Sequence, residues 1–108
     1  MVAYLLLLLA IVSEVIGTLA LKASDGFSRL WPSLIVVAGY GFAFTLLAQT
    51  LKSLGVGPTY ATWSALGTVG AAIGGWLIFG EKMSPISIGG MGIVIAGIVI
   101  MQWGSVTR

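Results

Sequence analysis

The chain has 108 residues, of which 58% are hydrophobic and only 7% are charged, and its mean hydropathy is +1.11. A soluble domain carries roughly 25% charged residues, so this composition excludes a soluble globular protein and indicates an integral membrane protein. A net charge of +2 with scattered basic residues indicates neither a nucleic-acid partner nor a polybasic lipid anchor, and the absence of Cys and His removes disulfides and the usual metal ligands.

The first apolar stretch, residues 4–21, contains a single carboxylate, Glu14. If a helix enters the bilayer at Tyr4, Glu14 lies roughly 15 Å deeper, near the middle of a hydrocarbon core about 30 Å thick. An acidic residue at that depth costs about 2.5–3.5 kcal/mol to insert. We therefore expect Glu14 to bind a proton or a cation, or to face a wet cavity. The alternative is a protonated Glu14 that acts only as a hydrogen-bonding strut between helices.

Three further apolar stretches follow, and short polar connections with Gly and Pro turn signals separate them. Each stretch is about 18–21 residues long, which suffices for a helix to cross a bilayer with modest tilt. The stretches are apolar all round, without the alternation of about ten residues that barrel strands require. The sequence thus predicts an all-α membrane protein with one four-helix transmembrane domain over residues 1–108 and helices at roughly 4–21, 32–51, 59–79 and 86–103.

The charges at the ends of these helices give almost no orientation bias. Lys52 and Arg108 would lie on one side of the membrane, and Lys22, Arg29 and Lys82 on the other. Two basic residues against three give no firm answer from the positive-inside rule. Either a weak signal is read in context, or the chain inserts both ways and pairs with an inverted copy.

The small size of the chain predicts an oligomer. Four short helices can hardly enclose a ligand path and still pack against one another, so a carrier site at Glu14 implies a dimer or higher assembly. Gly90 and Gly97, seven residues apart in the last helix, are the candidate packing face, because small residues let membrane helices approach closely. The alternative is that glycine is simply common in membrane helices.

Residues at helical spacing form a candidate site for an organic cation. A carboxylate beside aromatic rings attracts a large, weakly hydrated cation by charge pairing and by cation–π interaction. No pair of carboxylates and no phosphate-binding glycine loop occurs within these stretches, so we predict neither an enzyme nor a cofactor or metal site. The candidate site residues are Glu14 with Ala10, Gly17 and Thr18 on the same helix stripe, Tyr40 and Phe44 in the second stretch, and Tyr60 and Trp63 in the third.

Several segments form a set that is specific together, though not singly. They are Ser13-Glu-Val-Ile-Gly-Thr18, Leu21-Lys22, Asp25-Gly-Phe-Ser-Arg-Leu-Trp-Pro-Ser33 and Tyr60-Ala-Thr-Trp-Ser64, followed by Gly67. Together these segments resemble the small multidrug resistance transporters, over essentially the whole chain. The resemblance implies a multi-pass protein of the bacterial inner (plasma) membrane that works as an antiparallel, dual-topology dimer and exchanges protons for cations.

The resemblance also implies roles for individual residues. Glu14 matches the shared carboxylate for proton and substrate, and Tyr60 and Trp63 match the aromatic pair of the binding chamber. Ala10 and Gly17 resemble exporters of quaternary ammonium compounds, since guanidinium exporters typically have Gly and Trp there. Lining of the chamber by the second helix is implied for Tyr40 and Phe44, and a dimer seam in the fourth helix for Gly90 and Gly97.

We therefore expect a proton-coupled antiporter that exports hydrophobic, aromatic or quaternary ammonium cations, with proton and drug competing for Glu14. The alternatives are a guanidinium exporter of the same family, one half of an obligate heterodimeric pair, a passive pore, and a non-transport membrane assembly subunit. The expected partners are the organic cation, protons, membrane lipid and a second copy of the chain, with a paralogue as the alternative to a homodimer. No cofactor and no nucleic acid is expected.

Overall fold

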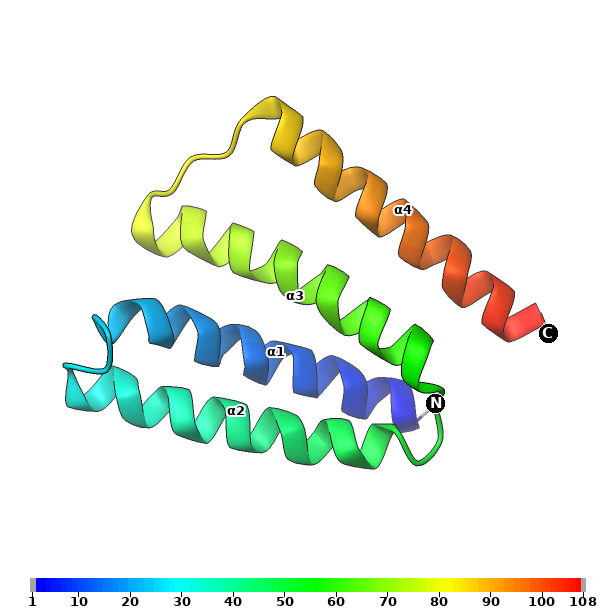
Figure 1. The fold of residues 1–108 in the computed structure, drawn as a ribbon, viewed down its shortest axis with the longest axis horizontal. Helices are drawn as coiled ribbons and strands as arrows, with labels where there is room; N and C mark the ends of the chain where they lie inside the picture. The colour runs from blue at the N-terminus through cyan, green and yellow to red at the C-terminus, as the bar shows by residue number, and fades with distance from the viewer. Residues whose placement is uncertain (1, 108) are drawn as a thin grey trace. The chain divides into compact units, whose positions relative to one another are not determined.

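The structure, a computed structural model, describes residues 2–107, and the side chains up to residue 104. Four α-helices make up almost all of this part of the chain: α1 (Val2–Ala23), α2 (Leu30–Thr50), α3 (Val56–Phe79) and α4 (Pro85–Thr107) (Figure 1). Each is long and apolar enough to span a membrane. The prediction of an all-α protein with four membrane-spanning helices is confirmed.

All four helices begin earlier than the sequence analysis placed them, and three of them contain a proline in the first turn. Pro32 and Pro58 are the third residues of α2 and α3, and Pro85 is the first residue of α4. The first N–H groups of a helix have no carbonyl partner within the helix, so a proline in the first turn loses no hydrogen bond there. The prolines thus lie inside the helix starts rather than before them.

The chain divides into two compact units at the boundary between Leu54 and Gly55. The first unit, here called the first hairpin, consists of α1 packed along α2, and the second hairpin consists of α3 and α4. Each hairpin has its own connection and its own packing.

The connection of the first hairpin is organised by Ser24, which is fully buried. Its hydroxyl donates to the Leu21 carbonyl at 2.7 Å and accepts the Phe27 N–H at 3.0 Å, while its carbonyl accepts the Arg29 N–H at 3.1 Å. These bonds hold residues 25–27 in left-handed backbone conformations, with φ of 48° at Asp25 and 68° at Phe27. The reversal between α1 and α2 is therefore a hydrogen-bonded turn with a defined shape.

The second hairpin has a connection of five residues, 80–84, between its helices. Gly80 ends α3 in a left-handed conformation with φ of 70°, which a glycine adopts without steric cost, and its N–H bonds the Trp76 carbonyl. Ser84 starts α4, because its hydroxyl accepts the Ser87 N–H at 3.1 Å. None of the residues of the α4 span Pro85–Gly104 is buried.

Candidate functional site

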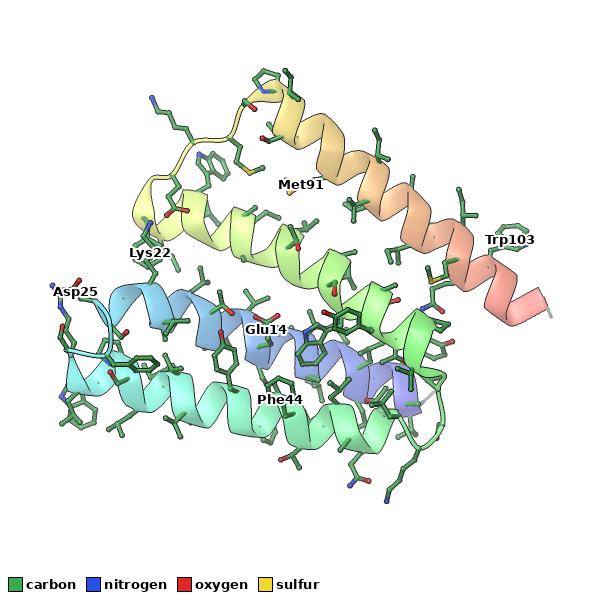
Figure 2. The ribbon with its side chains drawn as sticks, viewed as in Figure 1. Glu14, Lys22, Asp25, Phe44, Met91 and Trp103 are labelled. Carbon is green, nitrogen blue, oxygen red and sulfur yellow. The ribbon has the colours of Figure 1, made fainter. Side chains whose placement is uncertain are left out.

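Glu14 lies near the middle of α1 and is half-buried (Figure 2). The hydroxyl of Thr18, one helical turn further along, donates a hydrogen bond to Glu14 Oε2. The two residues are four apart, so they share one face of α1. The predicted stripe of Glu14 and Thr18 is thus present as a bonded pair rather than as neighbours only.

Tyr40 on α2 extends this pair into a chain of three groups. Its hydroxyl lies 2.7 Å from Thr18 Oγ1. A threonine hydroxyl has one hydrogen, and here that hydrogen points to the carboxylate, so the Tyr40 hydroxyl is the donor to Thr18. The order Tyr40 to Thr18 to Glu14 directs two hydroxyl dipoles toward the carboxylate. If Glu14 instead carries a proton, it can donate, and the order can reverse.

Two glycines allow Tyr40 to reach Thr18. A Cβ added to Gly17 would lie 3.2 Å from Cδ1 and Cε1 of the Tyr40 ring, so the ring packs on bare backbone. A Cβ added to Gly39 would lie 3.0 Å from the Ser13 carbonyl oxygen and 3.1 Å from the Cα of Gly17. Both contacts of Gly39 are with backbone, which cannot move aside as a side chain can. The crossing of α1 and α2 therefore requires glycine at both positions.

Gly39 is a residue that the sequence analysis missed. A usable signal was present in the run Gly39-Tyr40-Gly41, where small residues flank the aromatic residue. Spacing along one helix cannot show which of the two glycines faces a neighbour. In the structure Gly39 faces α1, whereas a Cβ at Gly41 meets no atom within 4 Å among the described residues.

The other first-hairpin candidates lie around this chain of groups. Ala10, one turn before Glu14, is fully buried. Phe44 follows Tyr40 by one turn, with ring centroids 6.4 Å apart and planes at 49°, and 57% of Phe44 is exposed. The two rings thus form one aromatic face on α2, on the same hairpin as the carboxylate, as the sequence analysis predicted from their spacing.

Tyr60 and Trp63 belong to α3, in the second hairpin. They are three residues apart, so they lie on one side of the helix; Tyr60 is 67% exposed, while Trp63 is 9% exposed. Next to them, the side-chain amide of Gln102 on α4 donates to the Thr62 hydroxyl at 2.6 Å. Each hairpin is described by itself, so the participation of Tyr60 and Trp63 in a site with Glu14 stays a prediction.

Gly90 and Gly97, the predicted packing face, lie on the exposed helix α4. A Cβ added at either would meet no heavy atom within 4 Å among the described residues. Their role in packing against a second chain also stays a prediction.

The chemistry available at Glu14 is limited to binding. Among the described residues, no group of three or more His, Cys, Asp or Glu side chains lies close enough to hold a metal ion. The first hairpin offers one carboxylate within a membrane span, two hydroxyls and an aromatic face. This combination suits a proton or an organic cation, because a carboxylate neutralises the charge and the rings attract it through their faces.

The fold and these residues define a multi-pass membrane protein with a carboxylate inside its first span. Comparison with known proteins identifies its family. Residues 2–95 match the family model described as Small Multidrug Resistance protein, so the chain belongs to that family.

Curated relatives agree with this assignment. The chain is 46% identical to the quaternary ammonium compound-resistance protein QacE of Escherichia coli, across 94% of this chain and 93% of the relative. It is 48% identical to the multidrug resistance protein EbrB of Bacillus atrophaeus, across 91% and 84%. A multidrug transporter of Pseudomonas aeruginosa is 41% identical, across 94% and 93%. These names are those of membrane transporters and resistance proteins, which supports indirectly the reading that the chain is not an enzyme.

Proposed function

We propose that this protein is a proton-coupled antiporter that exports aromatic and quaternary ammonium cations across the bacterial inner membrane. The observation that carries the proposal is the chain of hydrogen bonds from Tyr40 through Thr18 to Glu14, the one carboxylate within a membrane span of the described chain. Family membership and the resistance names of the relatives support the substrate class.

The site is completed, in this proposal, by groups outside the first hairpin. The two hairpins pack into one transmembrane domain that brings Tyr60 and Trp63 to the chamber. Two copies pair in antiparallel orientation through Gly90 and Gly97 of α4, whose open surface leaves room for a second helix. A homodimer is the simplest assembly, and a paralogue in place of the second copy would use the same surface.

Competition for Glu14 couples the two transported species. A cation that binds the ionised carboxylate excludes a proton from it, and protonation removes the charge that holds the cation. If the dimer changes its open side only when it is loaded with one or the other, a proton gradient drives export. Tyr40 and Thr18 hold the carboxylate in place for the cation, because the hydrogen bonds join it to α2 through Thr18.

The space beside Gly17 favours the binding of bulky cations. Gly17 leaves the space that the Tyr40 ring occupies, and a large side chain at that position would displace the ring from Thr18. An aromatic ring packed in this way can stack on or surround a large cation. Guanidinium is small and offers no comparable apolar surface, so it is the control substrate rather than the proposed one.

The test is proton release by purified protein in weakly buffered detergent when tetraphenylphosphonium is added. Wild type is expected to release protons, and Glu14→Gln to release none and to bind the cation no longer. Asp25→Asn is the matched control, since it removes a carboxylate from the exposed turn outside the spans. Full proton release by Glu14→Gln, or equal loss of proton release in Asp25→Asn, would contradict the proposal. Proton release with guanidinium but not with tetraphenylphosphonium would mean that the protein exports guanidinium instead of aromatic and quaternary ammonium cations.

A further inference from the structure

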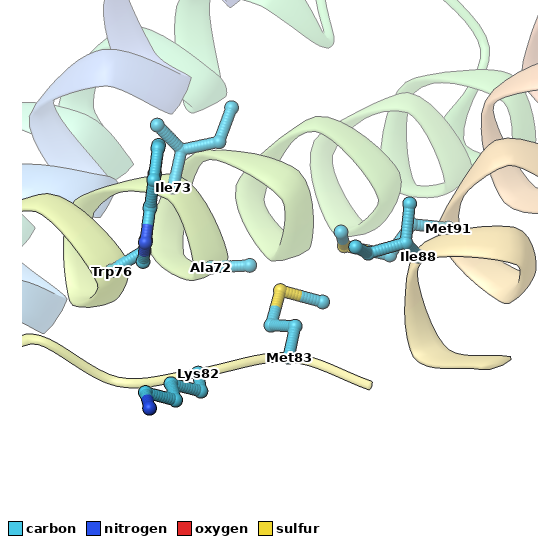
Figure 3. Close-up of a pocket in the computed structure, with 7 residues that line it drawn as sticks. All are labelled: Ala72, Ile73, Trp76, Lys82, Met83, Ile88 and Met91. Carbon is cyan, nitrogen blue, oxygen red and sulfur yellow. The ribbon is translucent and has the colours of Figure 1, made fainter. Parts of the chain in front are cut away.

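The second hairpin contains a cavity of about 550 Å³ that plays no part in the proposed exchange at Glu14. It lies between the end of α3, the connection and the start of α4 (Figure 3), and its size falls within the range of about 300–1,000 Å³ that is typical of small-molecule sites. The lining is apolar apart from one charged side chain. The residues that line the cavity are Ala72, Ile73, Trp76, Lys82, Met83, Ile88 and Met91.

The cavity runs from the membrane surface into the hydrocarbon. Lys82 and Met83 belong to the connection between two spanning helices, which must lie at the surface. Ala72 lies two turns before Gly80, so the cavity reaches roughly 12 Å along α3 at a rise of about 1.5 Å per residue. Its side chains remain accessible, since Trp76 is 59% exposed and Ile88 56%. The cavity is therefore an open slot with a polar end and an apolar depth.

The polar end carries positive charge. Lys82 is the only charged residue in the lining, and the indole nitrogen of Trp76 is directed toward the connection that carries it (Figure 3). The N-terminus of α4 begins three residues later, at Pro85, and adds the partial positive charge of a helix dipole. The nearest acidic residue in sequence, Glu81, is not part of the lining: its carboxylate covers Gly75 on α3, at the position that a Cβ would take.

We propose that this cavity binds an anionic phospholipid, with an acyl chain along Ile73, Ile88 and Met91 and the headgroup phosphate at Lys82. Basic pockets between membrane helices bind such headgroups, and Trp and Lys are the side chains that favour the headgroup region. A cationic drug would be repelled by Lys82. A lipid supplies both the chain and the charge.

The test uses Trp76 as a reporter inside the cavity. Full-length protein in which Trp31, Trp63 and Trp103 are replaced by Phe is reconstituted in phosphatidylcholine vesicles with phosphatidylglycerol, and either lipid carries brominated acyl chains that quench tryptophan on contact. No organic cation is added, so the result does not depend on proton exchange at Glu14. We expect brominated phosphatidylglycerol to quench about fivefold more effectively per molecule than brominated phosphatidylcholine, as attraction by one basic side chain predicts.

Two pairs of variants locate the effect. Lys82→Gln keeps most of the side chain but loses the charge, and is expected to abolish the preference for phosphatidylglycerol. Lys52→Gln makes the same charge change in the connection between α2 and α3 and should preserve that preference. Ala72→Leu narrows the cavity and should lower quenching by both lipids, whereas Ala96→Leu on the exposed face of α4 should not. Circular dichroism confirms that each variant is folded.

Three outcomes would overturn the proposal. Equal quenching of wild-type Trp76 by the two lipids would mean that the cavity does not select charge. Loss of the preference in Lys52→Gln as well as in Lys82→Gln would mean that net charge, not the cavity, attracts the lipid. Quenching by neither lipid would mean that protein, such as a second copy, occupies the cavity.

Discussion

In the first hairpin the two helices approach so closely that a Cβ on Gly39 would lie 3.0 Å from the Ser13 carbonyl, whereas in the second hairpin the glycines Gly90 and Gly97 face open space among the described residues. Polar contacts differ in the same way. The first hairpin joins its helices in the middle of the span, through Tyr40 and Thr18, and the second joins its helices near one end, through Gln102.

This difference suggests that the two hairpins have different roles. A fixed crossing of α1 and α2 holds the hydroxyls at hydrogen-bonding distance from Glu14, which a binding site for a proton or a cation needs. The open α4 and the slot at the other end of the second hairpin leave surface for lipid or for another chain. We therefore expect substitutions at the first crossing to change substrate binding strongly, and substitutions on α4 to act on stability and assembly.

The largest effect is expected at the crossing itself. Gly39→Leu forces the backbones apart, and overpacking of this kind costs about 1–3 kcal/mol. Tyr40 would then lose Thr18, and we expect affinity for tetraphenylphosphonium to fall about tenfold or more, which corresponds to about 1.4 kcal/mol. Gly41→Leu, two residues along on the open side of α2, is the matched control. Equal losses of affinity in the two variants would show that the close crossing of α1 and α2 is not needed for cation binding.

Removal of the Tyr40 hydroxyl should have a smaller effect. Tyr40→Phe keeps the ring but loses the donor to Thr18, and one hydrogen bond contributes about 0.5–1.5 kcal/mol, so affinity should fall about two- to tenfold. Titration of tetraphenylphosphonium binding to the purified variant measures this loss.

Variants at Thr18 and Tyr4 serve as controls for this prediction. Thr18→Val should reproduce the loss, whereas Thr18→Ser, which keeps a hydroxyl, should bind nearly as wild type. Tyr4→Phe removes a hydroxyl at the start of α1, outside the site, and should change nothing. Wild-type affinity in Tyr40→Phe would show that the hydroxyl chain does not act on cation binding at Glu14.

The four spans and the position of Glu14 and Thr18 on one face of α1 were predictable from the sequence. Hydropathy and length determine whether a segment can span a membrane, and spacing within one helix determines which residues share a face. The bond between Tyr40 and Thr18 was not predictable in the same way. It depends on the axial register of α1 against α2, which the contacts of Gly39 determine and which no single-helix pattern contains.

Gln102 was also missed, although it is the one amide in an otherwise apolar last span. A polar side chain in that environment needs a partner, and this need was a signal that could have been used. The identity of the partner, Thr62, lies 40 residues away in the chain and depends on how α3 meets α4. The same limit applies to the cavity at Lys82, whose lining comes from three separate segments.

A modest effect is expected when the Gln102 bond is broken. Gln102→Leu leaves the Thr62 hydroxyl without this donor, and hydrogen bonds between membrane helices contribute about 0.6 kcal/mol on average. Unfolding in mixed micelles should show a loss of about this size, while cation affinity should change little. Gln49→Leu at the exposed end of α2 makes the same replacement and should leave stability unchanged. A loss of cation affinity in Gln102→Leu as large as that in Tyr40→Phe would show that α4 contributes to cation binding as much as the first crossing does.

The smallest effect is expected at Gly75, where a Cβ would collide with the Glu81 carboxylate. Glycine to alanine in a helix interior gains up to about 1 kcal/mol, and Gly41→Ala, which faces open space, should show this gain. Gly75→Ala should gain less, because Glu81 must move from its place on α3. A displaced Glu81 carboxylate brings negative charge closer to Lys82, so the preference for phosphatidylglycerol should weaken in Gly75→Ala and not in Gly41→Ala. If both variants gain equally and keep the preference, the position of Glu81 contributes nothing to the charge of the cavity.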